Sequence, residues 1–430
     1  MNDDAPPASE RKEGVAINRS SRFKGNVARI AAASVVSQGI LFSATAVLTR
    51  LCTEDQFGAF AVFSGLLAIV AGLFTLKYDL AIVLPKENQQ ARELTAATML
   101  LSIALSGLFL ASMLTYGAVA GHTPGWQYLL LPLGAVLAAG VTCGQQWAAR
   151  AADYAWFSRS QVLSAVVNVG TAILLCHSFT GWLPGLLWGF LAGQASALIY
   201  LVVSFRPTLE AVGVRRAIAA AIDYKRFPLY VLPSMLLLTL TTSIQPWLLE
   251  KMFSLGEVGQ YAIANRVLLA PSALIGAAVS EAFRAELVVR LHRGESVTRF
   301  FSQVISSMTT LALLAFIGLA IVGEPLFTLV FGERYGPSGH LVRFLAAGAL
   351  AQFVVQPLHF VFIATGRVQT GLFVQIVSAT IPTLFLIAGA RTQSMENALL
   401  LYSFSALALA CGTVVLAYRV CSSSEERSSP

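Results

Sequence analysis

Charged residues are scarce in this sequence. Asp, Glu, Lys and Arg make up only 12% of the 430 residues, whereas soluble domains carry about 25%. Apolar residues account for 56% of the chain. This composition excludes an ordinary soluble domain and predicts a polytopic membrane protein. The net charge of +7 does not indicate a nucleic-acid partner, because the basic residues lie between apolar segments rather than in one patch.

Cysteine is also scarce, and no C-x-x-C pair occurs, so we expect neither a disulfide framework nor a metal site. The five copies are Cys52, Cys143, Cys176, Cys411 and Cys421. The sequence has no nucleotide-binding P-loop and no H-E-x-x-H or G-x-S-x-G motif. The longest connection between apolar runs, residues 206–226, is too short for a catalytic domain. We therefore expect a protein that is not an enzyme and that needs no cofactor.

Gaps without charged residues divide the chain into predicted transmembrane helices. No charged residue lies between Glu93 and Arg150 or between Arg159 and Arg206. Each gap can hold two helices of about 20 residues joined by a turn. The other predicted spans are Val27–Thr49, Phe57–Val83, Phe227–Leu249, Tyr261–Phe283, Phe300–Gly323, Phe344–Gly366, Val368–Ala390 and Asn397–Tyr418. The sequence thus predicts an all-α protein with twelve transmembrane helices.

Lys and Arg are unevenly divided between the two ends of these spans. Of the 29, 21 lie in the tails and loops of one side, five lie on the other side and three lie within spans. Positively charged loops favour the cytoplasm, so both termini are predicted there. A signal peptide ending near Ser43–Ala46 is the alternative for the first span, although its cleavage would leave an odd number of spans.

The predicted organisation follows from these spans. It comprises a disordered cytoplasmic tail (1–26), an N-lobe of six spans (27–205), a basic cytoplasmic linker (206–226), a C-lobe of six spans (227–418) and a cytoplasmic tail (419–430).

An internal repeat supports the division into two lobes. Arg50–Val62 (RLCTEDQFGAFAV) resembles Lys251–Ile263 (KMFSLGEVGQYAI) at an offset of 201 residues. With one residue inserted, Asp79 aligns with Glu281. An even number of spans separates the copies, so the halves have the same orientation and are related by an axis along the membrane normal. Two six-helix lobes should therefore flank a central cavity.

Four segments carry a resemblance to a known family. They are TRLCTEDQFGAFAV (49–62), LKYDLAIVLP (76–85), VGQYAIANRVLLAPSALIGAAVSEAF (258–283) and VFGERYGPSGHLVRFLA (330–346). In this order they resemble motifs of the Wzx-type polysaccharide flippases, which belong to the multidrug/oligosaccharidyl-lipid/polysaccharide (MOP) exporter superfamily. Glu54, Lys77 and Tyr335 stand where these flippases often have Pro, Arg and Trp. The resemblance therefore indicates the superfamily rather than one subfamily.

The resemblance implies transport of a lipid-linked oligosaccharide of the undecaprenyl-diphosphate type. The substrate would move from the cytoplasmic to the periplasmic leaflet of a bacterial inner membrane, for synthesis of lipopolysaccharide or exopolysaccharide. Membrane lipids, a polysaccharide polymerase and export proteins are the implied partners, and whether H⁺ or Na⁺ drives transport is left open. One alternative is a cation-coupled multidrug antiporter of the same superfamily, which would favour an acidic residue deep in the first lobe. Another is a polysaccharide polymerase or ligase, which would favour a large periplasmic loop.

Arg266 is the strongest candidate for substrate binding, because a guanidinium within a span is rare and can bind phosphate oxygens bidentately. Asn265 precedes it, and Arg29 at the start of the first span could act on the entrance side. Arg266 could instead reach toward periplasmic headgroups, and Arg29 could simply be one of the positive charges expected on the cytoplasmic side.

Amides and an imidazole within the spans could hydrogen-bond sugar hydroxyls or bridge neighbouring helices. Gln38 and Gln245 are included among the binding candidates, and Pro246 after Gln245 predicts a kink in the seventh span. The polar set is Gln38, Gln145, Gln146, Asn168, Gln194, Gln245, Gln352, Gln356 and His359.

Charged residues at the cytoplasmic ends of the second and eighth spans predict a gate. Lys77 and Asp79 lie about 30 Å along the second span from its periplasmic start, and Glu281 and Arg284 hold the matching position in the other lobe. We expect Lys77–Glu281 and Asp79–Arg284 pairs when the cavity faces outward. The alternative is simple snorkelling of these side chains at a helix end.

Overall fold

The structure is a computed structural model that describes residues 32–121, 125–151, 153–178, 185–204, 212–271, 275–293 and 296–428. Within these ranges the regular structure is helical, as the sequence predicts. In the described part of the chain, ten helices are long and apolar enough to cross a membrane. The predicted seventh span falls on a shorter apolar helical segment, Phe227–Ser243, and residues 272–274 of the predicted eighth span lie outside the described ranges.

The first helix is Ala32–Leu51. The N-terminal half continues with α2 (Glu54–Phe74), α3 (Asn88–Ala120), α4 (Leu131–Arg150), α5 (Tyr154–Ser178) and α6 (Gly185–Ser204). A short helix α7 (Val214–Asp223) precedes α8 (Leu232–Ser243), α9 (Gln245–Glu250) and α10 (Leu255–Pro271). The remainder is α11 (Ala277–Arg293), α12 (Val297–Phe331), α13 (Gly336–Val355), α14 (His359–Ala364), α15 (Val368–Ala390) and α16 (Met395–Ser428).

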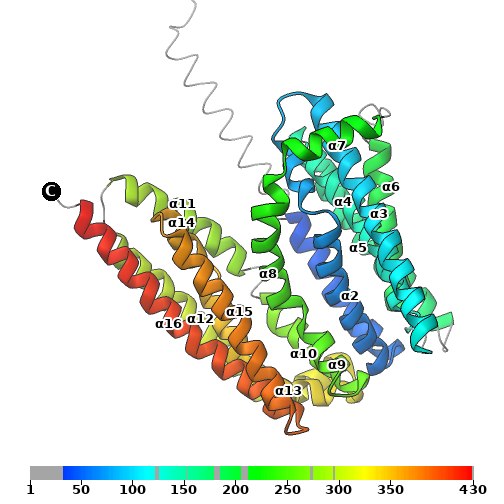
Figure 1. Cartoon of the computed structure of the whole chain (residues 1–430). Coiled ribbons are helices and arrows are strands. Elements are labelled where there is room, and N and C mark those ends of the chain that lie inside the picture. Colours follow the sequence, from blue (N-terminus) through cyan, green and yellow to red (C-terminus); the bar gives the residue numbers. More distant parts are fainter. Residues whose placement is uncertain are drawn as a thin grey trace, which may run out of the picture.

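The helices form two lobes that meet at one end and diverge toward the other (Figure 1). Helices α2 to α6 form one lobe, and α11 to α16 lie in the other, with α8 between them. The closed end is the end at which α2, α9, α10 and α13 come together, and the open end carries α7 and the C-terminus. This arrangement confirms the predicted two-lobed all-α architecture.

Two glycines join the lobes at the closed end, at equivalent positions of the sequence repeat. A Cβ added to Gly58 in α2 would lie 2.0 Å from the carbonyl oxygen of Leu255, and one added to Gly259 in α10 would lie 2.0 Å from that of Glu54. The contact is reciprocal, since both pairs are related by the offset of 201 residues. Only glycine allows backbones to approach this closely, so the repeat motif builds a pseudo-symmetric crossing of α2 and α10.

The second span is shorter than predicted. Helix α2 ends at Phe74, because Leu76 and Lys77 adopt left-handed backbone conformations with φ of 45° and 60°. A 3₁₀ turn over Tyr78–Val83 follows and packs into the N-lobe. The prediction that the span continues to Val83 is therefore wrong.

Arg150 at the end of α4 holds this turn in place. Its guanidinium donates to the carbonyl oxygens of Ile82, Pro85 and Lys86, the last at 3.1 Å. It also donates to the Asn88 side chain at 3.0 Å. Arg150 therefore donates hydrogen bonds to backbone carbonyls that have no partner within a helix, and it fixes the connection between α2 and α3.

The seventh span is broken where Pro246 predicts a kink. Helix α8 ends at Ser243, and α9 starts at Gln245 with the proline in its first turn. The missing N–H of a proline ends the hydrogen-bond ladder of the preceding helix. The predicted eighth span corresponds to α10 and α11, and residues 272–274 between them lie outside the described ranges.

A disulfide joins Cys52 and Cys176, whose Cα atoms lie 6.0 Å apart. The sequence was expected to imply no disulfide framework, and it did not predict this single bond. The two residues are 124 positions apart in the sequence and follow no spacing pattern. They come together only because the first helix and α5 end at the same side of the N-lobe.

Candidate functional site

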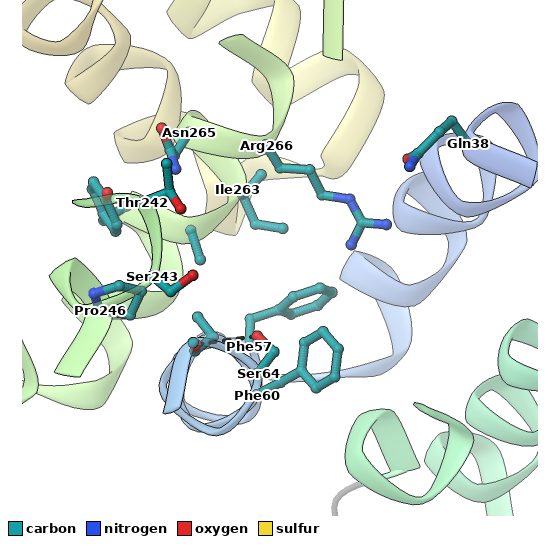
Figure 2. Close-up of a pocket in the computed structure, with 14 residues that line it drawn as sticks. Gln38, Phe57, Phe60, Ser64, Thr242, Ser243, Pro246, Ile263, Asn265 and Arg266 are labelled. Atoms are coloured by element: carbon teal, nitrogen blue, oxygen red, sulfur yellow. Dashed lines mark hydrogen bonds between the residues drawn. The ribbon is translucent and has the colours of Figure 1, made fainter. Parts of the chain in front are cut away.

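A cavity of about 390 Å³ lies between the lobes near the closed end. Helices α2, α8 and α10 and the first helix provide its walls, and Figure 2 shows the side chains that face it. The lining residues are Gln38, Phe57, Phe60, Ala61, Ser64, Gly65, Thr242, Ser243, Pro246, Tyr261, Ala262, Ile263, Asn265 and Arg266. Three of the predicted binding residues are therefore brought together here: Gln38, Asn265 and Arg266.

Arg266 is the single charged residue in this lining. Its side chain extends across the cavity toward the first helix (Figure 2), where Nη2 donates to the carbonyl oxygen of Leu41 at 3.2 Å. Among the described residues no carboxylate lies within 4.0 Å of it. The other N–H groups of the guanidinium therefore have no acceptor in the described part of the chain. Such a cation can accept an anionic ligand without first giving up an ion pair.

Gln38 and Asn265 lie on opposite sides of Arg266. Gln38 is on the first helix, which the guanidinium approaches, whereas Asn265 points toward Thr242 of α8 (Figure 2). The two amides could therefore bind different parts of one ligand. The predicted entrance residue, Arg29, lies outside the described residues.

Gln245 is buried, with 5% of its surface exposed, and does not line this cavity. Its amide nitrogen donates to Tyr402 Oη at 2.6 Å and to the carbonyl of Thr241 at 3.1 Å, and its oxygen accepts from Tyr261 Oη. Gln352 donates to the same Tyr402 hydroxyl at 3.2 Å. These hydrogen bonds tie α9 to α10 and α16, so in this conformation Gln245 bridges helices.

The structure does not form an Asp79–Arg284 pair. Asp79 is 4% exposed, and its Oδ1 has no hydrogen-bond partner in the described structure. Burial raises the pKa of its carboxyl above the ordinary value, and the charge of Lys77 lowers it by less. Arg284 is exposed and lies over the Phe360 ring at 5.2 Å. In this structure the two lobes are apart at the end that carries Asp79 and Arg284. The ion pairs were predicted for the other state, in which this end is closed.

Of the other two gate residues, Lys77 lies just beyond the end of α2. Its side chain folds back along the helix, so that Nζ would lie 3.7 Å from a Cβ added to Gly72. The side chain of Glu281 lies outside the described residues.

Sequence reasoning missed the contacts that hold the closed end together. Tyr128 at the start of α4 donates to Glu250 Oε1 of α9 at 2.5 Å, and the other carboxylate oxygen of Glu250 is buried without a partner in the described structure. Tyr335 donates to the carbonyl of Cys52 at 3.4 Å and packs edge-to-face on Phe57. The one available signal was Tyr335, which occupies an aromatic position of a family motif.

A protein-family model described as "Polysaccharide biosynthesis protein" matches residues 47–339. No curated protein matches the sequence significantly. Among solved structures, the lipid II flippase MurJ in an inward closed conformation matches with a TM-score of 0.74 at 10% identity, covering 93% of this chain and 90% of that one.

Multidrug resistance MATE family transporters of the MOP superfamily match as well. An inward-facing structure matches with a TM-score of 0.60 at 14% identity, covering 92% of this chain and 96% of that one. An outward-facing structure matches with a TM-score of 0.61 at 13% identity, covering 93% and 96%.

At such identities the solved structures establish the fold and not the substrate. The shared fold is that of transporters and flippases, not of enzymes. The family match spans more than half of the chain and includes the α2–α10 crossing and Arg266. The chain therefore belongs to the polysaccharide biosynthesis protein family and has the fold of the MOP superfamily.

Proposed function

We propose that the protein moves a polyprenyl-diphosphate-linked oligosaccharide from the cytoplasmic to the periplasmic leaflet of a bacterial inner membrane. The substrate would be of the undecaprenyl-diphosphate type and would serve synthesis of lipopolysaccharide or exopolysaccharide. The family match supports a role with polysaccharide, and the fold shared with a lipid II flippase supports handling of a lipid-linked sugar. The lobes would expose the cavity to each side in turn.

The observation that carries this proposal is the position of Arg266. It lies between the lobes, in the cavity that a rocking motion would expose alternately, and most of its donors have no acceptor in the described chain. A diphosphate presents several anionic oxygens, and a guanidinium binds such groups in a fork geometry that a lysine does not reproduce. We assign Arg266 to the diphosphate.

Two observations support the orientation with cytoplasmic termini. The first is the excess of Lys and Arg in the loops of that side. The second is the Cys52–Cys176 disulfide, which lies at the side predicted to be periplasmic. Disulfides persist in the oxidising periplasm and are rare in the cytosol. The open end of this conformation would then face the cytoplasm.

The rival function is cation-coupled drug export. That function would favour an acidic residue deep in the first lobe. Asp79, a buried carboxylate of that lobe, lies beyond the end of α2, and no carboxylate lines the inter-lobe cavity. The same lining offers a cation and amides, which suit a phosphorylated glycolipid better than a cationic drug.

The test compares Arg266→Ala and Arg266→Lys in a strain that depends on this protein for polysaccharide export. We expect Ala to abolish export while the protein still accumulates in the membrane, since charge and fork are both lost. Lys should retain a fraction of activity, because a point charge still attracts phosphate. Arg343→Ala is the matched control, because Arg343 lies outside the cavity and its side chain is about half exposed.

Arg29→Ala should be milder than Arg266→Ala, because other cations of the tail can replace it at the entrance. Normal export by Arg266→Ala at normal expression would contradict the diphosphate assignment. Equal loss in Arg343→Ala would show that the assay reports stability rather than binding.

A further inference from the structure

A second cavity, of about 210 Å³, lies inside the N-lobe between the first helix, α4, α5 and α6. Its lining is polar but carries no charge. It consists of Ser34, Ser37, Gln38, Leu41, Val141, Gln145, Ser160, Gln161, Ser164, Ala165, Asn168, Phe190, Gln194 and Ala197. Four of the amide side chains predicted as sugar-binding candidates, Gln38, Gln145, Asn168 and Gln194, therefore meet in one place.

A glycine stripe on α6 creates this convergence. A Cβ on Gly189 would lie 2.6 Å from the carbonyl oxygen of Asn168, and one on Gly193 would lie 2.6 Å from that of Ser164. Small residues spaced four apart let membrane helices pack backbone to backbone. The close packing of α5 on α6 brings Asn168 and Gln194 to the same wall of the cavity.

Several polar groups in this cavity lack partners. The side-chain amides of Gln145, Asn168 and Gln194 are half-buried and make no hydrogen bond within the described part of the protein. Ser37 is only 8% exposed, and its Oγ is buried without an acceptor or donor among the described residues. A buried polar atom such as this hydroxyl is nearly always satisfied in folded proteins, by the chain itself, by water or by a ligand, whereas the half-buried amides can bind water or a ligand. A helix-bridging role, the alternative for such amides, would have left them paired.

The chemistry of the lining selects the ligand. Each amide offers both donors and an acceptor, and the serines offer hydroxyls that serve as either. Such a set matches the hydroxyls of a sugar, which also donate and accept. A fatty chain would leave these groups unsatisfied, and a carboxylate-bearing sugar would find no cation in the lining. The volume is that of about seven waters, which suits one monosaccharide ring.

We propose that this cavity, the amide pocket, binds an uncharged pyranose of the lipid-linked substrate. The proposal rests on the proposed flippase function and names the sugar class it would carry. Gln38 lines both the amide pocket and the inter-lobe cavity that holds Arg266. The diphosphate at Arg266 and the first sugar in the amide pocket are thus neighbouring parts of one ligand, and Gln38 contacts their junction.

The experiment measures the affinity of the full-length protein in nanodiscs for defined lipids. The probes are bare undecaprenyl diphosphate, the same lipid carrying glucose, galactose or N-acetylglucosamine, and the lipid carrying glucuronic acid. The variants are the double substitution Gln145→Leu/Gln194→Leu, and Arg266→Ala. Gln146→Leu is the matched control, because Gln146 is adjacent on α4 and does not line the pocket.

In the wild type at least one neutral sugar should strengthen binding over the bare lipid by about tenfold, and glucuronic acid should not. The double variant should lose this gain while it keeps the affinity for the bare lipid, which also shows that it is folded. Gln146→Leu should keep both. Arg266→Ala should weaken binding of every probe, including the bare lipid.

Equal wild-type affinity for bare and sugar-bearing lipids would overturn the amide pocket and leave the flippase proposal standing. The amide pocket is likewise overturned if the double variant retains the sugar gain, or if glucuronic acid binds as well as the neutral sugars. If the wild type binds none of the lipids, the proposed function and the amide pocket both fail.

Discussion

The reciprocal contact of Gly58 and Gly259 predicts how strongly an alanine at either position would favour separation of the lobes at the closed end. A methyl group at either glycine would lie 2.0 Å from a carbonyl oxygen of the other helix, well inside the 3.4 Å at which ordinary contact begins. The obstacle is backbone, which cannot rotate away as a side chain can. Overpacking of this kind costs about 1–3 kcal/mol, which shifts an equilibrium between two conformations about 5- to 150-fold. We therefore expect Gly58→Ala or Gly259→Ala to favour separation of the lobes at this end.

Spin labels at Trp126 and Thr392 would report the separation, because both positions are exposed and belong to different lobes. The measured distance distribution should shift to longer values in Gly58→Ala and Gly259→Ala. Gly107→Ala is the control, since Gly107 lies within α3 and an added Cβ meets nothing within 4 Å. That substitution should even favour its helix by up to about 1 kcal/mol. Distributions for Gly58→Ala and Gly259→Ala that match the wild type would refute the reasoning.

The fold was largely predictable because membrane helices leave a simple mark in sequence. Val368–Ala390 was predicted as one span, and α15 has these same bounds. The predicted end of the second span was wrong for a local reason. Its apolar run continues past Phe74, but the left-handed turn at Leu76 and Lys77 has no glycine or proline to announce it. The disulfide was not predicted for a global reason, because it joins helix ends that are far apart in the sequence and that only the tertiary fold brings together.

The site was predictable in part. Arg266 and Asn265 stand out as polar residues within an apolar run, and the structure brings them to the inter-lobe cavity. Gln245 is likewise a polar residue within an apolar run, yet its amide already forms hydrogen bonds with Tyr261 and Tyr402. Composition cannot tell a paired amide from an unpaired one, because the partners come from other helices. The same limit hid the amide pocket, whose members were candidates without a known meeting place.

Two further predictions concern the closed end and the orientation. Tyr128→Phe removes a hydrogen bond to the Glu250 carboxylate, and such a bond to a charged acceptor is worth about 1.5–3 kcal/mol. Spin labels at Trp126 and Thr392 should therefore again move apart. An unchanged distance distribution would show that this contact does not hold the lobes together. A cysteine-directed, membrane-impermeant probe applied from outside should label a cysteine introduced at Trp126 and miss one at Arg215, and labelling of both would contradict the assigned topology.

The repeat also explains why the cation sits on one side of the inter-lobe cavity. Gly65 and Arg266 are separated by the same offset of 201 residues as the crossing glycines. A Cβ on Gly65 would lie 2.3 Å from the carbonyl of Ser243, so α8 packs directly against α2. At the equivalent place in the other half, the Arg266 side chain spans the space to Leu41 of the first helix. One half therefore uses glycine to bring two helices into contact, and the other uses a long cation to bridge them. This departure from symmetry leaves an open cavity with one positive charge, which fits the diphosphate that we propose as its ligand.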